Sequence, residues 1–328
     1  MKPSTATTRV VHARDFRPGD YARGQKHALS LDLGVDVIGP LAVVLIHGAR
    51  PGNTLVLTAG VHGDEYEGVR AILDITSKLD PASLTGTVLA VPVANPPAFW
   101  NGSRTSPLDG ANLARTFPGK EQGTPSEVLA YWLGESIISR ADFYLDMHSA
   151  GVKLLMPSMV GFPTGDERAR AAALAFGAPV VWSHPTVGPG RTISLASARR
   201  IPWLYTEARG AGRIHPDDLA MFERGITNLM RYLGMVAGRV DVRPPERWLH
   251  GDGDLDASLT ATRAGFFIPA IELLDFVRAG QEIGHTVDLH GEILERFRAT
   301  RDGAIGMVRA FPIVQPGDAV CLVTEVLE

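Results

Sequence analysis

Apolar residues recur with two different periods over about the first 240 positions of the chain. Short uninterrupted apolar runs, which are typical of buried strands, lie at 55–59, 87–93, 143–147 and 201–206. Apolar side chains at helical spacing predict helices at 66–79, 126–139, 166–176 and 217–237. Strands that alternate with helices in this way indicate an α/β sheet covered on both faces.

One long segment interrupts this alternation. Residues 95–123 are rich in Asn, Pro, Gly and Ser and predict a loop, and the following helix has Thr124 or Ser126 as its cap. Loops of this length inside a compact domain are usually functional or disordered. We therefore expect part of the functional site in this segment.

The pattern changes near residue 240. The polar segment VDVRPPERWLHGDGDLD, with its paired prolines, predicts a linker or crossover. Short strands separated by Gly and Pro follow it, and FVRAGQEIG and PIVQPGDAV look like two copies of one turn. We predict a catalytic domain with an N-terminal β segment at 1–240 and a small all-β domain at 241–328.

The 241–328 segment resembles lipoyl and biotinyl carrier domains, which need a lysine to modify. No lysine follows Lys153 in the sequence. A carrier role is therefore improbable, and the segment is better explained as a lid or packing domain.

Composition narrows the class of protein. The chain has 328 residues, of which 45% are apolar, and a formal net charge of −4, so nothing favours a nucleic-acid partner. Its one cysteine, Cys321, excludes a disulfide framework and argues against a cysteine-based metal site. The N-terminus lacks a signal-peptide core, and no apolar run approaches the roughly 18 residues of a membrane span. A cytoplasmic enzyme without a membrane partner is the simplest prediction.

Two histidines and a glutamate follow the ends of predicted strands. His62 and Glu65 come three residues apart just after 55–59, and His148 directly follows 143–147. Strand ends and the loops after them form the binding crevice of such sheets. Two histidines and one carboxylate with an open fourth position are typical of catalytic zinc. These three residues are our predicted metal ligands.

Other interpretations of the same residues stay open. Either histidine alone could be a polar cap on its strand, and Asp64 or Glu67 could replace Glu65 as ligand. Asp146 precedes His148 by two residues, so it could support the ligand imidazole or be a buried, satisfied acid. His47 also follows an apolar run, but no acid is placed near it.

Four segments together carry a resemblance to a known family: HGDEYEG, DGANLARTFPG, DMHSAG and IPWLYTEARGAG. They resemble the succinylglutamate desuccinylase/aspartoacylase family of the zinc carboxypeptidase superfamily, over about 40–240, with the C-terminal β domain extending the likeness. The resemblance implies a doubly wound mixed α/β sheet with a small barrel-sandwich-like β domain. It also implies one zinc ion per chain and hydrolysis of an N-acyl amino acid or related small acidic amide.

The resemblance also assigns substrate-binding residues. In the family an Asn-Arg pair in the long loop binds the substrate carboxylate, with help from an earlier Arg. Here Arg115 holds the Arg position, Arg104 is the candidate for the earlier Arg, and Asn112 lies in the same loop. Position 114 is Ala where the family usually has Asn, so the pocket lacks one hydrogen-bond donor and the substrate is expected to be atypical.

The remaining expected site residues lie near the strand predicted at 201–206. By resemblance Glu207 is the general base, and Glu272 in FFIPAIE is the rival. Arg209 stands where relatives commonly have a small residue, so it is either a substrate contact or a surface charge, and Arg191 is a weaker candidate for that contact. A zinc carboxypeptidase acting on short peptides and a non-catalytic binding protein are the alternatives to an amidohydrolase. The expected partner is a small molecule with a carboxylate, and a homo-oligomer is compatible with the sequence.

Overall fold

A mixed β-sheet runs through the molecule from its N-terminal strands into its C-terminal part. The computed structural model describes residues 9–251, 253 and 255–327. Within these residues fifteen strands form one sheet, whose main path has the order β1-β2-β3-β5-β4-β6-β10-β8-β9-β11-β19-β17-β14. Its strands up to β10 are β1 (Arg9–His12), β2 (Gln25–Asp32), β3 (Leu41–His47), β4 (Arg50–Ala59), β5 (Thr85–Val91), β6 (Phe143–Met147), β7 (Leu154–Leu155), β8 (Met159–Pro163), β9 (Val180–His184) and β10 (Trp203–Glu207).

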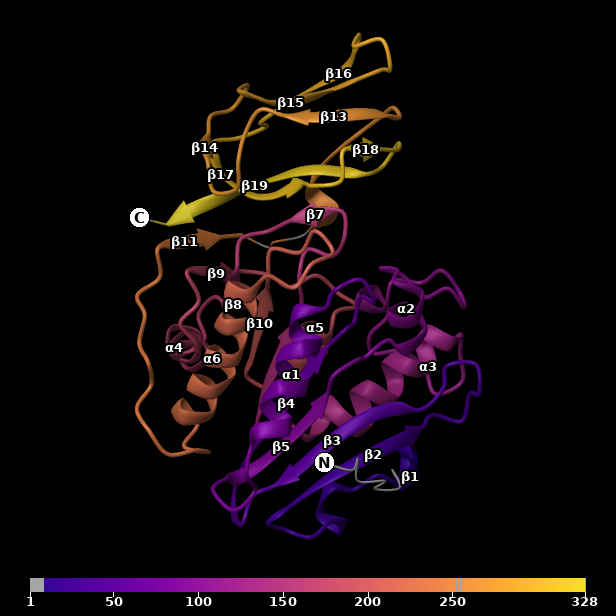
Figure 1. Cartoon of the computed structure of the whole chain (residues 1–328), viewed down its shortest axis with the longest axis vertical. Helices are drawn as coiled ribbons and strands as arrows, with labels where there is room; N and C mark the ends of the chain where they lie inside the picture. Colours follow the sequence, from indigo (N-terminus) through magenta and orange to yellow (C-terminus); the bar gives the residue numbers. More distant parts are fainter. Residues whose placement is uncertain (1–8, 252, 254, 328) are drawn as a thin grey trace.

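Helices cover both faces of this sheet (Figure 1). One face packs on α1 (Glu67–Lys78), α4 (Glu167–Phe176) and α6 (Pro216–Tyr232), and the other on α3 (Pro125–Trp132) and α5 (Thr192–Ala198). Because both faces are covered, successive side chains of β4 pack alternately into the two cores. Val56 belongs to the core on the α3 and α5 side, whereas its neighbours Leu55 and Leu57 belong to the core on the opposite side. A strand buried on both faces has to be apolar throughout, as the sequence pattern indicated.

The predicted elements are present, with shifted ends. The helix predicted to reach 139 is α-helical only to Trp132 and continues as a π turn and a 3-10 turn, and Thr124 caps it through a capping box. The helix predicted to reach 237 ends at Tyr232, shortly before Gly234, whose φ of +71° favours glycine. Inside the predicted long loop lie α2 (Pro96–Asn101) and the short turn η3 (Leu113–Arg115).

The C-terminal part is all-β and stacks on one end of the α/β body (Figure 1). A second sheet there has the order β16-β15-β13-β18. The strands of this part are β11 (Arg247–His250), β12 (Leu259–Thr260), β13 (Gly265–Pro269), β14 (Phe276–Val277), β15 (Glu282–Val287), β16 (Ile293–Arg298), β17 (Gly303–Arg309), β18 (Ile313–Val314) and β19 (Ala319–Leu327). Phe267, Ile283, Phe297 and Val320 pack into its own core. The fold is thus the mixed α/β sheet with a small β domain that the sequence predicted.

The two parts of the chain contribute strands to the same large sheet. β11 pairs in parallel with β9 and antiparallel with β19, so the large sheet continues from one part into the other. The short strand β7 also pairs with β17. The division at 240/241 stays a prediction, and the first strand after it is joined to the catalytic sheet. Among the described residues, no helix has the length and apolar character needed to cross a membrane.

Candidate active site

Three neighbouring strands bring the predicted site residues together. β4 and β10 both pair in parallel with β6, and Met147 at the end of β6 is opposite both Ala59 and Thr206. Their carboxyl ends therefore lie at one edge of the sheet. His62, His148 and Glu207 come at or just after these three ends. The apolar runs place these residues side by side because the strands that they form are neighbours.

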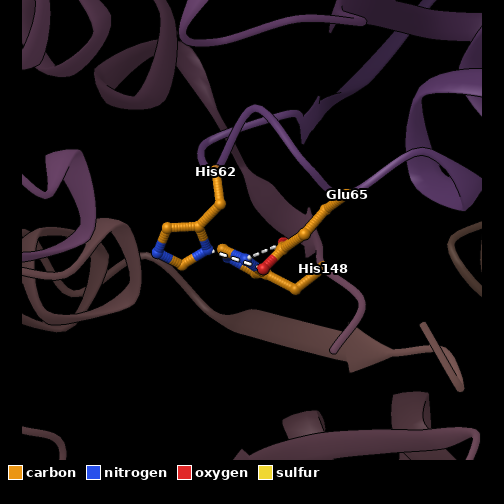
Figure 2. A group of neighbouring side chains, drawn as sticks. All are labelled: His62, Glu65 and His148. Atoms are coloured by element: carbon orange, nitrogen blue, oxygen red, sulfur yellow. Dashed lines mark hydrogen bonds and ion pairs between the residues drawn. The ribbon is translucent and has the colours of Figure 1, made fainter. Parts of the chain in front are cut away.

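His62, Glu65 and His148 form one compact cluster (Figure 2). Glu65 lies between the two imidazoles: its Oε1 is 2.7 Å from His62 Nδ1 and its Oε2 is 2.8 Å from His148 Nδ1. One candidate ligand atom from each residue lies within 4.8 Å of the others. The side chains are 4–11% exposed, so the cluster is withdrawn from bulk water.

The second nitrogen of each imidazole is held by an oxygen. His148 Nε2 lies 2.9 Å from Asp146 Oδ2, and His62 Nε2 lies 3.1 Å from Asn112 Oδ1. Both rings consequently turn Nδ1 toward Glu65. Fixing one ring nitrogen in this way sets the tautomer and direction of a metal-binding imidazole. Of the two roles open to Asp146, the structure favours support of His148.

Asp146 is itself fixed by hydroxyl groups. Thr58 donates to its Oδ1 at 2.6 Å, and Thr192 donates to its Oδ2. Tyr144 Oη lies 2.6 Å from the Thr58 hydroxyl and extends the network beneath the cluster. Asp146, Thr58 and Tyr144 are fully or almost fully buried. A buried, fully paired network of this kind holds His148 in one orientation.

Charges in the cluster perturb one another strongly. Burial alone would raise the pKa of Glu65, but the two imidazoles outweigh it and hold that pKa below its usual range. Burial lowers the pKa of His62, and Arg104 lowers it further. Burial opposes protonation of His148, yet Asp146 and Glu65 raise its pKa well above the usual range. The carboxylates thus create a place that attracts positive charge beside His148 Nδ1.

Glu207 is the last residue of β10 and lines the cavity next to the cluster. Its Oε2 is buried and has no hydrogen-bond partner among the described residues. Burial, with the nearby charge of Glu65, raises the pKa of Glu207 to about 8. A carboxyl group with such a pKa can both take and give a proton near neutral pH.

The cavity, about 680 Å³ with the adjoining space open to solvent included, is lined by two predicted arginines. Arg104 donates from Nη1 to Glu65 Oε1 at 3.1 Å, and Arg115 donates from Nε to Asp256 Oδ2 at 3.0 Å. Ala114 also lines the cavity, which is where the missing family Asn would project. Both predicted arginines therefore line the cavity that His62 and His148 also line, and Arg104 contacts the cluster directly.

Two predicted substrate contacts lie elsewhere. Arg209 forms an ion pair with Asp218, N to O 3.2 Å, and lines a different cavity, so the structure does not bring it to the substrate. Asn112 holds His62 and caps the η3 turn, instead of lining the cavity. Glu272 lies in a turn of the β domain, where its N–H bonds to Asp275.

Several cavity residues were given little or no weight from the sequence. The cavity is also lined by Arg191, His184, Tyr205, Met156, Val187, Thr192 and Gly253. Tyr205 lies two residues before Glu207 in β10, so strand alternation predicts a common face for them. The segment VGPGR, which precedes Thr192, is rich in turn-forming residues and ends in the charged Arg191. This pattern is only a weak indication that the segment lines a pocket. Gly253 comes from 241–328, so this part of the chain borders the cavity.

The residues present fit a single zinc ion. Two imidazole nitrogens and a carboxylate oxygen converge from a buried cluster, and both rings have an oriented outer partner. His62 and His148 also line the cavity, so a small molecule that enters it could reach an ion held by the cluster.

Comparison with known proteins agrees with this geometry. The succinylglutamate desuccinylase/aspartoacylase catalytic domain matches residues 51–233. The chain is 35% identical to N-alpha-acetyl-L-2,4-diaminobutyric acid deacetylase of Halomonas elongata over 287 residues, which make up 84% of this chain and 83% of that protein.

Solved structures share the fold over almost the whole chain. The succinylglutamate desuccinylase/aspartoacylase of Rhodobacter sphaeroides is 30% identical with a TM-score of 0.83, covering 96% of this chain and 98% of that one. The product-bound ectoine utilization protein EutE (DoeB) of Ruegeria pomeroyi is 26% identical, also with a TM-score of 0.83, and covers 93% and 96%. The chain belongs to the succinylglutamate desuccinylase/aspartoacylase family.

Proposed function

We propose that this protein is a zinc-dependent deacylase that hydrolyses the amide bond of a small N-acyl amino acid. The observation that carries the proposal is the cluster of His62, Glu65 and His148 at one edge of the sheet, where His62, His148 and Glu207 line one cavity. The relationship to a deacetylase of an acetylated diamino acid supports amide hydrolysis. A cytoplasmic location remains part of the proposal.

Each residue has a separate role in the proposed reaction. His62, Glu65 and His148 would hold one zinc ion, which polarises a carbonyl and makes water a usable nucleophile near neutral pH. Glu207 takes the proton of the attacking water on its carboxylate and passes it to the leaving nitrogen. Burial, which raises its pKa, stabilises the protonated carboxyl group that forms between the two steps.

The arginines orient the substrate. Arg115, which lines the cavity, would hold the substrate carboxylate and so align the amide with the reacting groups. Arg104 lies against Glu65, 3.1 Å from its Oε1, so it is close to where negative charge develops on the carbonyl oxygen.

A direct test uses zinc content and a substrate panel together. We expect about one zinc per chain in the purified protein and a large loss of zinc in His148→Ala, because that variant removes one of three protein ligands. Wild-type zinc content in His148→Ala would end the assignment.

The panel compares N-acetyl amino acids with dipeptides. The deacylase proposal expects the N-acetyl compounds to be cleaved much faster. A preference for dipeptides would instead support the alternative, a zinc carboxypeptidase acting on short peptides.

A further inference from the structure

Two residues early in the C-terminal part, Gly253 and Asp256, lie at or beside the lining of the active-site cavity. Gly253 lines the cavity, and a Cβ atom at this position would lie 2.9 Å from His184 Cε1 and 3.4 Å from Tyr205 Oη. Asp256 follows in the turn η6 (Leu255–Ala257), and β12, which comes next, pairs with β19. Gly253 thus lies at the cavity wall, and the chain after Asp256 joins the β domain through β12.

Asp256 brings a negative charge to the predicted carboxylate-binding arginine. Arg115 Nε donates to Asp256 Oδ2 at 3.0 Å, across 141 positions of sequence. The side chain of Asp256 is 69% exposed, whereas that of Arg115 is 30% exposed. The hydrogen bond from Arg115 lowers the pKa of Asp256, and the charges of Arg191 and Arg104 add to the effect. Asp256 is therefore ionised at neutral pH.

This arrangement is unsuited to a substrate with two negative groups. A second carboxylate near Arg115 would meet Asp256 and be repelled. A substrate with one carboxylate and one ammonium group matches the adjacent charges of opposite sign. The exposed carboxylate of Asp256 can accept hydrogen bonds from an ammonium group while it keeps its contact with Arg115.

We propose that Asp256 is a specificity-determining residue: it selects N-acyl amino acids whose side chain carries an ammonium group, by binding that group while Arg115 binds the carboxylate. This deepens the proposed function and rests on it. The Halomonas elongata relative acts on an acetylated amino acid that has a second amino group, which agrees with this chemistry. The carbon skeleton of that substrate places the two charged groups close enough to meet adjacent side chains.

Two other roles for Asp256 make different predictions. If the pair with Arg115 only holds the segment in place, its loss should affect all substrates equally. An ion pair this exposed also stabilises a fold little. Asp256 could instead compete with the substrate carboxylate for Arg115. Its loss should then raise kcat/KM for acidic substrates and leave kcat/KM for cationic substrates unchanged.

The test compares three substrates that differ in side-chain charge: N-acetyl-2,4-diaminobutyrate, N-acetyl-2-aminobutyrate and N-acetylaspartate. The variant is Asp256→Asn. Asp217→Asn is the matched control, because Asp217 also lies near an arginine, 3.7 Å from Arg209, but is 95% exposed and outside the active-site cavity. We expect Asp256→Asn to lower kcat/KM for the diamino substrate by about 10-fold, and to change it by less than about 2-fold for the neutral substrate. The control should show neither change.

A binding measurement separates this proposal from the proposed function. Calorimetric titration of zinc-loaded protein with free 2,4-diaminobutyrate, 2-aminobutyrate and aspartate needs no turnover. If the wild type hydrolyses none of the acetyl compounds, the proposed function fails, and a preference for 2,4-diaminobutyrate that Asp256→Asn abolishes still supports the role of Asp256. Equal binding of the three compounds, or equal effects of Asp256→Asn on all three substrates, would overturn it. So would a gain on N-acetylaspartate without a loss on the diamino substrate.

Discussion

The side-chain oxygen of Asn112 lies 3.1 Å from His62 Nε2, while Nδ1 of the same ring faces Glu65 at 2.7 Å. Asn112 comes from the long loop and also accepts a hydrogen bond from the Ala114 N–H. One loop residue thus orients a predicted metal ligand and fixes the backbone of a residue that lines the cavity. Loop conformation and zinc affinity should consequently be linked.

Replacing Asn112 tests that link. We expect Asn112→Ala to weaken zinc binding by about 10-fold or more, because the His62 ring loses the partner that sets its orientation. Zinc affinity is measured by competition with a chelator. Asn112→Asp keeps an oxygen acceptor and should retain most of the affinity, and Asn101→Ala, at the exposed C-terminal end of α2, is the neutral control. If Asn112→Ala binds zinc normally and only raises KM, Asn112 contacts substrate and the orienting role is refuted.

Glu207→Gln separates proton transfer from a structural role. Gln keeps the size of the side chain but cannot accept a proton, so turnover should fall by roughly 10²-fold to 10⁴-fold. Zinc content should stay unchanged because Glu207 is not among the clustered candidate ligands. A folded, zinc-loaded variant with near-normal turnover would remove Glu207 from the mechanism and return attention to Glu272.

The same substitution predicts a pH-dependent change in stability of the zinc-free protein. The pKa of Glu207 is raised to about 8 in the folded state, above the roughly 4.3 of an unfolded chain. The folded state therefore binds the proton more tightly, and wild-type stability should fall as pH rises from about 4 through about 8. Glu207→Gln lacks this loss, so its melting temperature should exceed that of the wild type increasingly toward pH 8. Parallel melting curves for the two proteins across this range would contradict the raised pKa.

Ala114→Asn probes the departure from the family pattern. Ala114 lines the cavity next to Arg115, and Asn would add a hydrogen-bond donor there. We expect preference to shift toward compact acidic N-acyl amino acids, measured as the ranking of kcat/KM across a panel. Ala114→Ser, which adds a smaller polar group, serves as the comparison. An unchanged ranking would show that position 114 has no part in selecting the substrate.

The thiol of Cys321 should be unreactive in the folded protein. Its side chain is fully buried, and burial raises the pKa of its thiol to about 12, so almost no reactive thiolate exists at neutral pH. A colorimetric thiol reagent should report about one reactive thiol per chain in denaturant and almost none without it. Rapid reaction of the native protein would mean that the β domain opens readily.

The sequence alone was enough to predict the sheet and the residues at its carboxyl edge. His62, Glu65, His148 and Glu207 follow apolar runs, and buried strands end where polar residues begin. Neighbouring parallel strands then bring such residues together without further information. The predicted fold is confirmed, whereas zinc as the bound metal and the base role of Glu207 stay predictions. The N-terminal β segment was predicted without bounds for its strands β1, β2 and β3, and the ends of α3 and α6 were misplaced, because short strands and helix ends depend on packing.

Only the tertiary structure decided which partners the polar side chains take. Arg209, predicted as either a substrate contact or a surface charge, pairs with Asp218, whereas Asn112, predicted at the substrate, holds His62. Arg115 meets Asp256 across 141 positions of sequence. Apolar periodicity constrains which face of an element is buried, but it says nothing about the direction of a loop. Ion pairs and hydrogen bonds between distant loops form only after the core has fixed where those loops begin and end.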